Sequence, residues 1–139
     1  MYRTKIDVRY SETDKMGIVY HANYFPWFEV ARSRFAIEHG MNYAETENRG
    51  LRMPLADCYC KFIKSAVYGD SVYVDTEISY LGVAKCRFDF VVRRESDEAL
   101  LAKGYTTHAF TDTDLRPLNL KKRYPDVYEK LLEMRGETQ

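Results

Sequence analysis

The stretch "ETDKMGIVYHANYFPWFEVARSRF", residues 12–35, decides the fold, because a loop passes directly into an amphipathic helix within it. Asp14 and His21 stand on either side of Gly17, just before the helical pattern begins. That pattern runs from about residue 22 to residue 39, since apolar side chains recur at helical spacing along it. One stripe contains the apolar side chains expected to face the core: Tyr24, Trp27, Phe28, Ala31 and Phe35.

Two residues bound the predicted helix. Pro26 fits only the first turn of a helix, where its missing N–H group is not needed. Gly40 indicates the C-terminal end, because glycine readily takes the left-handed conformation that closes many helices. Glu29, Arg32 and Arg34 lie outside the apolar stripe. Glu29 and Arg32 are three residues apart, which predicts a helix ion pair or a contact between subunits.

Outside this helix the apolar residues alternate with a period of two, which indicates strands. The predicted strands cover residues 4–10, 55–64, 72–80, 86–93 and 100–110, with turn signals between the later ones. A short helix is predicted over residues 125–134. One long helix and about five antiparallel strands predict an α+β fold. Tyr10 is expected on one face with Ile6 and Val8, and Tyr80 on one face with Val72 and Ile78.

Composition predicts one ordinary domain over residues 1–139, with 45% hydrophobic and 30% charged residues. The 21 basic residues balance the 21 acidic ones, so no net charge attracts nucleic acid or an anionic membrane. No apolar leader opens the chain, and no run approaches the roughly 18 apolar residues of a membrane span. Cys58, Cys60 and Cys86 form no disulfide framework and have no histidine ligands nearby, so we expect reduced thiols, no metal site and a cytoplasmic location.

The sheet also predicts self-association. One helix covers only part of a five-stranded sheet, so its edges and the uncovered face remain open. Pairing with a second copy of the chain closes such edges, and we therefore expect a homo-oligomer.

The segment "VRYSETDKMGIVYHANYFPWFEVAR", residues 8–32, resembles the hotdog-fold acyl-CoA thioesterases. It is most similar to the 4-hydroxybenzoyl-CoA thioesterase family and its Tol-Pal-associated acyl-CoA thioesterase branch. The shared pattern is Tyr-x3-Asp-x2-Gly-(Ile/Val)-Val-Tyr-His-x2-Tyr, followed by Glu-x2-Arg on the helix. Weaker similarity continues through "SAVYGDSVYVDTEI" and "LLAKGYTTHAFTD".

This resemblance implies a hotdog fold, in which an antiparallel sheet wraps around one helix. It implies dimers that pair their sheets edge to edge, and commonly homotetramers built from two dimers. The implied activity is hydrolysis of an acyl-CoA thioester, without a metal or redox cofactor, since CoA is part of the substrate.

Position by position, the resemblance makes Asp14 the catalytic carboxylate and places the amide of residue 21 where the family binds the thioester carbonyl. Tyr10 and His21 match polar partners of the Tol-Pal-associated branch, whereas the 4-hydroxybenzoyl enzyme has a tyrosine at the position of His21. The resemblance also suggests lysines that contact the CoA phosphates of a neighbouring subunit: Lys85, with Lys61 and Lys64 as further candidates.

Thioester hydrolysis requires a nucleophile or an activated water, and donors for the oxyanion. Asp14 could attack the carbonyl carbon or deprotonate a water, and the sequence does not distinguish these routes. The free N–H groups around His21 and Ala22 could bind the carbonyl oxygen. Gly17 would let the chain fold back between the carboxylate and the helix.

Structural explanations compete with these assignments. Asp14 is also a common turn residue, His21 could cap the helix, and Tyr10 could simply pack on a strand. A non-catalytic acyl-CoA-binding or scaffold protein is one alternative function. An (R)-specific enoyl-CoA hydratase is another, although its Asp-x4-His dyad differs from Asp14-x6-His21. The sequence does not identify the acyl group or decide whether its carrier is CoA or an acyl-carrier protein. It also does not distinguish a dimer from a tetramer.

Overall fold

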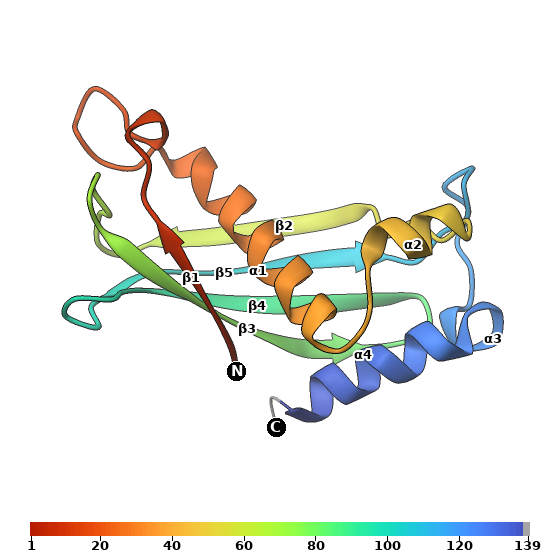
Figure 1. Cartoon of the computed structure of the whole chain (residues 1–139). Coiled ribbons are helices and arrows are strands. Elements are labelled where there is room, and N and C mark those ends of the chain that lie inside the picture. Colours follow the sequence, from red (N-terminus) through yellow and green to blue (C-terminus); the bar gives the residue numbers. More distant parts are fainter. Residues whose placement is uncertain (138–139) are drawn as a thin grey trace.

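The alternating apolar residues form one antiparallel sheet in this computed structural model, which describes residues 1–137. The strand order is β1-β3-β4-β5-β2, so β1 and β2 are the edges. Figure 1 shows the strands, whose bounds are β1 Tyr2–Asp7, β2 Leu55–Phe62, β3 Ser71–Leu81, β4 Lys85–Arg94 and β5 Leu100–Ala109.

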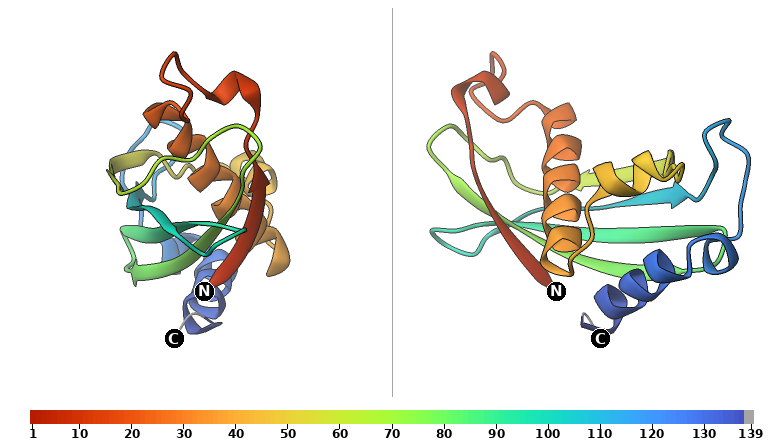
Figure 2. Two further views of the ribbon diagram at one scale, coloured as in Figure 1. Left: turned by 90° about the vertical axis from the view of Figure 1, so that its left-hand side faces the viewer. Right: turned by 45° about the vertical axis from the view of Figure 1, so that its right-hand side comes forward.

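The long helix α1, Tyr24–Glu38, crosses one face of the sheet (Figures 1 and 2). All five residues of the predicted apolar stripe are buried. The ring of Phe28 stacks on that of Phe90 in β4, with centroids 4.4 Å apart and 5° between the planes. The predicted α+β fold of one helix against five antiparallel strands is therefore confirmed.

Gly104 in β5 lets the helix approach the sheet closely. A Cβ atom at this position would lie 2.5 Å from the carbonyl oxygen of Tyr59 and 2.8 Å from the ring of Phe28. Real side chains do not tolerate such distances, so any larger residue would push β2 or α1 away.

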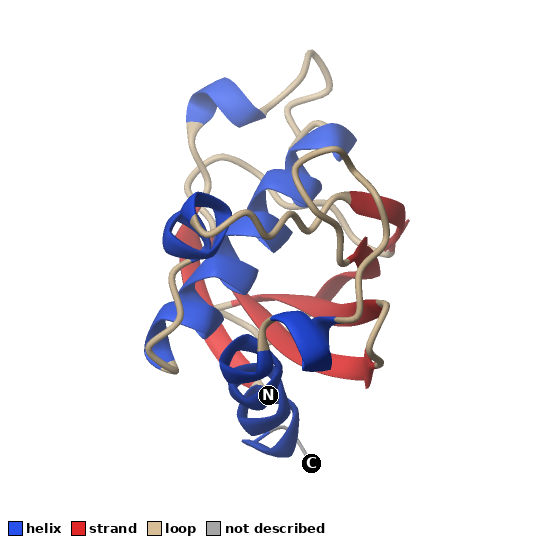
Figure 3. Ribbon diagram, turned by 90° about the vertical axis from the view of Figure 1, so that its right-hand side faces the viewer, coloured by secondary structure: helices blue, strands red, loops and turns tan. Residues whose placement is uncertain are grey.

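Three shorter helices complete the described chain: α2 Tyr43–Asn48, α3 Leu120–Arg123 and α4 Pro125–Glu137. The sequence predicted α4, whose Val127, Leu131 and Met134 are buried. It did not predict α2 or α3, because helices of six and four residues are too short to show a clear apolar period. Figure 3 shows that the helices lie largely to one side of the sheet. None of the helices among residues 1–137 is long and apolar enough to cross a membrane.

Two residues do not keep the strand face that the alternation predicts. β1 ends at Asp7, and Tyr10 instead begins a short 3-10 turn, Tyr10–Glu12, where its side chain is 75% exposed. Tyr80 is exposed because a β-bulge between Ile78 and Tyr80 shifts the alternation, so that Leu81 takes the inward position. A bulge adds one residue to a strand, and a strict period of two cannot anticipate it.

The edge strand β2 remains open to solvent. Seven of its eight residues are exposed, with Cys60 intermediate. Leu55 is 54% exposed, Tyr59 50% and Phe62 47%. Such a row of exposed apolar side chains beside unpaired backbone groups is typical of a strand that pairs with another chain.

Candidate active site

A tight loop holds Asp14 at the N-terminal end of α1. Thr13 and Val19 form an isolated antiparallel bridge that closes the loop. Inside it, the N–H of Asp14 donates to the carbonyl of Ile18 at 2.9 Å, and the N–H of Gly17 donates to the carbonyl of Asp14 at 3.0 Å. Gly17 has φ +80°, a left-handed conformation that glycine adopts without strain. The predicted fold-back at Gly17 is therefore confirmed.

The two carboxylate oxygens of Asp14 have different surroundings. Oδ1 accepts a hydrogen bond of 2.8 Å from the N–H of Met16, which is a typical Asx-turn contact. Oδ2 has no hydrogen-bond partner among residues 1–137. The half-buried side chain lines a cavity of about 230 Å³, and His21 lines the same cavity.

The turn before α1 contains two backbone donors without a partner among residues 1–137. His21–Asn23 form a 3-10 turn ahead of α1, in which Asn23 N–H donates to the carbonyl of Tyr20 at 2.9 Å. Tyr20 N–H donates to the carbonyl of Glu12 at 2.8 Å. Between them, the N–H groups of His21 and Ala22 make no hydrogen bond within the described part of the chain. The first N–H groups of a helical turn have no partner inside it, so both can bind a ligand oxygen.

The opposite wall of the cavity comes from the end of β2 and the residues after it. Ile18 bridges to Val67, and Val19 N–H donates to the carbonyl of Ala66 at 2.9 Å, which brings this segment against the loop. The sequence analysis did not identify this wall, because only the pairing of distant segments creates it. The cavity is lined by Asp14, Met16, Ile18, Val19, His21, Tyr24, Phe62, Ile63, Lys64 and Ser65.

Aromatic rings pack closely at the mouth of the site. The Tyr24 ring lies 5.1 Å from that of Phe62, and the His21 ring lies 6.2 Å from Phe62, measured between centroids. Burial raises the pKa of Tyr24, so its hydroxyl stays protonated at neutral pH. The cavity therefore combines one carboxylate with an apolar, aromatic wall.

Glu12 positions the loop, and the sequence analysis missed it. Its buried carboxylate accepts hydrogen bonds of 2.8 Å from the Trp27 indole N–H and from the Arg9 backbone N–H. Its carbonyl accepts a further one, 2.8 Å, from the Asn23 side chain. Glu12 thus ties the loop to α1. An acidic residue in a polar loop carries no sequence signal of burial.

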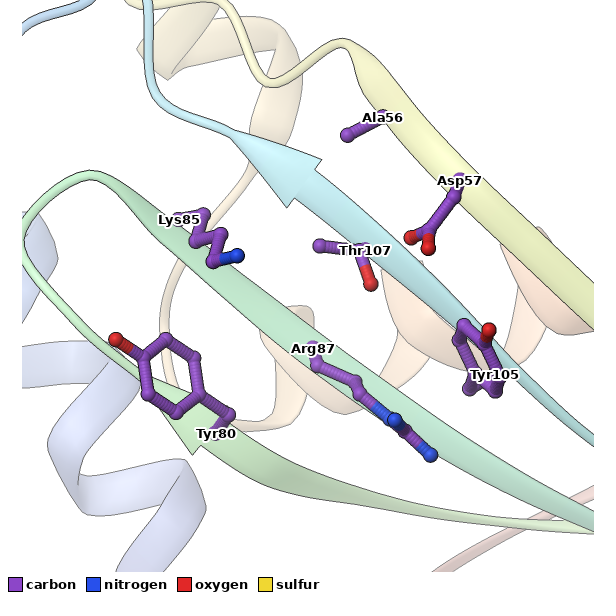
Figure 4. Close-up of a pocket in the computed structure, with 7 residues that line it drawn as sticks. All are labelled: Ala56, Asp57, Tyr80, Lys85, Arg87, Tyr105 and Thr107. Carbon is purple, nitrogen blue, oxygen red and sulfur yellow. The ribbon is translucent and has the colours of Figure 1, made fainter.

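Tyr10 and Lys85 of the same chain do not reach the Asp14 cavity. Tyr10 packs edge-on against Tyr68, with ring centroids 5.7 Å apart. Lys85 begins β4 and lines a separate cavity of about 640 Å³ on the face of the sheet away from α1 (Figure 4). The predicted roles of both residues stay predictions.

This outer-face cavity is larger than the one at Asp14, yet it holds a different set of groups. The Arg87 guanidinium donates to Asp89 at 2.8 Å and lies 3.9 Å from the ring centroid of Tyr105, so neighbouring side chains already engage it. Figure 4 shows Arg87 on β4 and Tyr105 on the neighbouring strand β5. The Asp14 cavity is lined by that carboxylate and by His21, whose N–H has no partner in the described part of the chain.

The cysteines and potential metal ligands do not gather into a reactive centre. Burial raises the pKa of the Cys60 thiol to about 11 and that of Cys86 to about 12, so neither is a thiolate at neutral pH. Cys58 is exposed. Within residues 1–137, no three or more His, Cys, Asp or Glu side chains lie close enough together to hold a metal ion.

Comparison with known proteins places this geometry in context. The profile of the thioesterase-like superfamily matches residues 8–134. YneP of Bacillus subtilis (strain 168), provisionally named an acyl-CoA thioesterase, is 34% identical over 132 residues, covering 92% of this chain and 95% of YneP.

Solved structures agree with this match. The DHNA-CoA thioesterase from Staphylococcus aureus has a TM-score of 0.91 and 31% identity, covering 98% of this chain and 91% of that one. A Thermus thermophilus protein of unassigned function has a TM-score of 0.87 and 33% identity, covering 96% and 99%. The likeness therefore extends over the whole fold and confirms the hotdog architecture.

Proposed function

Because the chain belongs to the thioesterase-like superfamily, we propose that it hydrolyses an acyl-CoA thioester to a free acid and CoA. One observation carries this proposal: Asp14 and His21 line one cavity, and the His21 N–H, at the start of the turn before α1, has no hydrogen-bond partner among residues 1–137. Provisionally named and solved relatives that act on acyl-CoA thioesters support the same reaction. The names of these relatives do not mention the Tol-Pal-associated branch, so the assignment of this chain to that branch stays a prediction.

The proposed chemistry divides between the carboxylate and the amides. The thioester carbonyl oxygen accepts hydrogen bonds from the N–H groups of His21 and Ala22, which stabilise the negative charge that develops there. The positive end of the helix dipole acts in the same direction. The C–S bond then breaks, and CoA leaves as a thiolate that takes a proton from water.

Asp14 has two possible roles in this scheme. As a nucleophile, its Oδ2 adds to the carbonyl carbon and forms a mixed anhydride, which water hydrolyses. As a general base, it removes a proton from the attacking water. Both roles are supported by its hydrogen bonding, since Met16 N–H holds Oδ1 while Oδ2 remains unpaired.

His21 is proposed to contact the substrate at the cavity mouth, where its ring lies beside Phe62. Tyr10 is 75% exposed, so a role for it requires substrate that extends out of the cavity. Lys85 lies on the outer face, and a contact with CoA phosphates there requires a neighbouring subunit.

We also propose a homodimer, or a dimer of dimers, built on the open strand β2. Antiparallel pairing of two β2 strands centred on Tyr59 sets Asp57 of one copy opposite Lys61 of the other, twice by symmetry. Opposite charges facing each other across strands are favourable, and this register also covers the exposed apolar side chains. The three free cysteines support a reducing location, and the cytoplasm is proposed.

The direct test is release of free CoA thiol from a panel of acyl-CoAs. We expect Asp14→Asn to lower kcat by about 100-fold or more, because the amide can neither attack nor accept the proton. Asp114→Asn, which changes an exposed aspartate in the loop after β5, is the matched control and should retain activity.

Each alternative has its own outcome. A hydratase would consume enoyl absorbance without releasing thiol. A non-catalytic binder would bind acyl-CoA with no turnover in the wild type. Full activity in Asp14→Asn would exclude the proposed role of this carboxylate.

A further inference from the structure

A third cavity opens between α1 and the start of β2, on the same face of the sheet as α1. Its volume is about 300 Å³, at the lower end of the range typical of ligand sites. Most of its walls are apolar or aromatic, and a few polar groups interrupt them. It is lined by Phe25, Pro26, Phe28, Glu29, Arg32, Met53, Leu55, Thr106 and His108.

Arg32 is the cation of this cavity, which we call the Arg32 cavity. Its guanidinium lies over the ring of Tyr43, 4.6 Å from the centroid, and 5.9 Å from that of Phe88. The side chain is partly buried, unlike its predicted position outside the core face. The helix ion pair with Glu29 that the sequence suggested does not form, and no other carboxylate among residues 1–137 pairs with Arg32.

His108 and Tyr43, which lie next to Arg32, are neutral at pH 7 and cannot balance this charge. Burial lowers the pKa of His108 to about 4, and the positive charge of Arg32 adds to the effect. His108 is held by the Met53 carbonyl at 3.1 Å and the Thr106 hydroxyl at 3.0 Å. Burial raises the pKa of Tyr43 to about 12. The exposed Glu29 is the one carboxylate lining the cavity.

The position of this cavity relates it to the candidate active site of another copy. Leu55, at one end of β2, lines the Arg32 cavity, whereas Phe62, at the other end, lines the Asp14 cavity. Within one chain these ends are separated by about 23 Å of strand. In the antiparallel pairing proposed above, the Leu55 end of one copy lies beside the Phe62 end of the other, about 5 Å away.

We propose that the Arg32 cavity receives the acyl group of a thioester held at Asp14 of a second copy. Arg32 then donates hydrogen bonds to an oxygen of that acyl group, carried by a hydroxyl or a carboxylate. The apolar walls hold the hydrocarbon part, and the guanidinium selects acyl groups that present an acceptor. This inference deepens the proposed function and rests on it and on the β2 pairing.

The test compares matched pairs of substrates with the Arg32→Met variant. The pairs are 4-hydroxybenzoyl-CoA with benzoyl-CoA, and glutaryl-CoA with pentanoyl-CoA. We expect kcat/KM to fall about 10- to 100-fold for the oxygenated member of at least one pair, and by less than about threefold for its partner, as for a lost charged hydrogen bond. The affected pair identifies the acceptor. Arg34→Met, at an exposed position of the same helix, is the control and should leave kcat/KM unchanged for both members of each pair.

Equal loss within both pairs, or no loss in either, overturns the proposal. If Arg32→Met does not fold, Arg32→Gln is measured in the same way and decides. Equilibrium binding of the four compounds to the Asp14→Asn protein tests the role of the Arg32 cavity separately from the proposed hydrolysis. If the wild type releases thiol neither from these four compounds nor from the wider panel, the proposed function fails, and the effect of Arg32→Met on binding decides the role of the cavity.

Discussion

At the scale of single residues, Asp14 shows that a structural and a chemical role can coexist. Its Oδ1 closes the turn by accepting from Met16 N–H, so the structural explanation of this aspartate is correct as far as it goes. Because Oδ1 is engaged, Oδ2 is the oxygen that remains available in the cavity that Asp14 and His21 both line. The same hydrogen bond that makes the turn thus pre-organises the proposed catalytic oxygen.

Glu12 holds the loop that contains Asp14 against α1 through its hydrogen bonds. We expect Glu12→Ala to lower the free energy of unfolding by about 1–3 kcal/mol, because the buried indole N–H of Trp27 and the partly buried N–H of Arg9 lose their acceptor. Trp27 is the only tryptophan, so urea unfolding followed by its fluorescence measures the effect directly.

The conservative variant Glu12→Gln supplies the control. It retains one carbonyl oxygen as an acceptor and should lose less stability than Glu12→Ala. The Glu12→Ala variant should also lose turnover, since the loop that holds Asp14 is no longer tied to α1. Wild-type stability in Glu12→Ala would contradict the anchoring role.

At the scale of elements, local patterns predicted α1 and most of the sheet correctly. The apolar stripe from Tyr24 to Phe35 is buried as expected, and Gly40, with φ +75°, follows the helix end. The failures occurred where the chain departs from a strict period, at the turn containing Tyr10 and the bulge before Tyr80. Periodicity reports regular elements and is insensitive to a single inserted residue.

The contact between α1 and β5 gives a prediction at this scale. Gly104→Ala should lower the free energy of unfolding by about 1–3 kcal/mol, because the added methyl group would overlap the Tyr59 carbonyl and the Phe28 ring. Chemical denaturation measures this. Gly136→Ala in α4 is the control: nothing lies within 4 Å of a Cβ there, so it should be neutral or stabilising. Equal stability of the two variants would contradict the tight approach.

At the scale of the whole molecule, the exposed strand β2 and the two separate cavities fit a structure completed by a second copy. Asp57→Lys should raise the dissociation constant of the proposed dimer by about tenfold or more. The new lysine would face Lys61 of the second copy at both symmetry-related contacts, and like charges facing each other across strands repel. Lys61→Asp should do the same with two acidic residues. Light scattering over a dilution series measures the dissociation.

The double variant Asp57→Lys, Lys61→Asp is the decisive control. It exchanges the charges and should restore dimerisation, because the two opposite-charge contacts form again. A double variant as weak as the single ones, or single variants that dimerise like the wild type, would rule out the register centred on Tyr59.

The sequence by itself determined α1, α4, most of the sheet and the loop that contains Asp14, because turn chemistry, helix caps and apolar periods act between residues close along the chain. Asp14, Gly17 and His21 belong to one such local segment, and their arrangement could be predicted. The tertiary structure alone decided the burial of Glu12, the wall at Phe62 and the partial burial of Arg32. These depend on which distant segments pair and how closely they pack, and no local pattern in the chain encodes that.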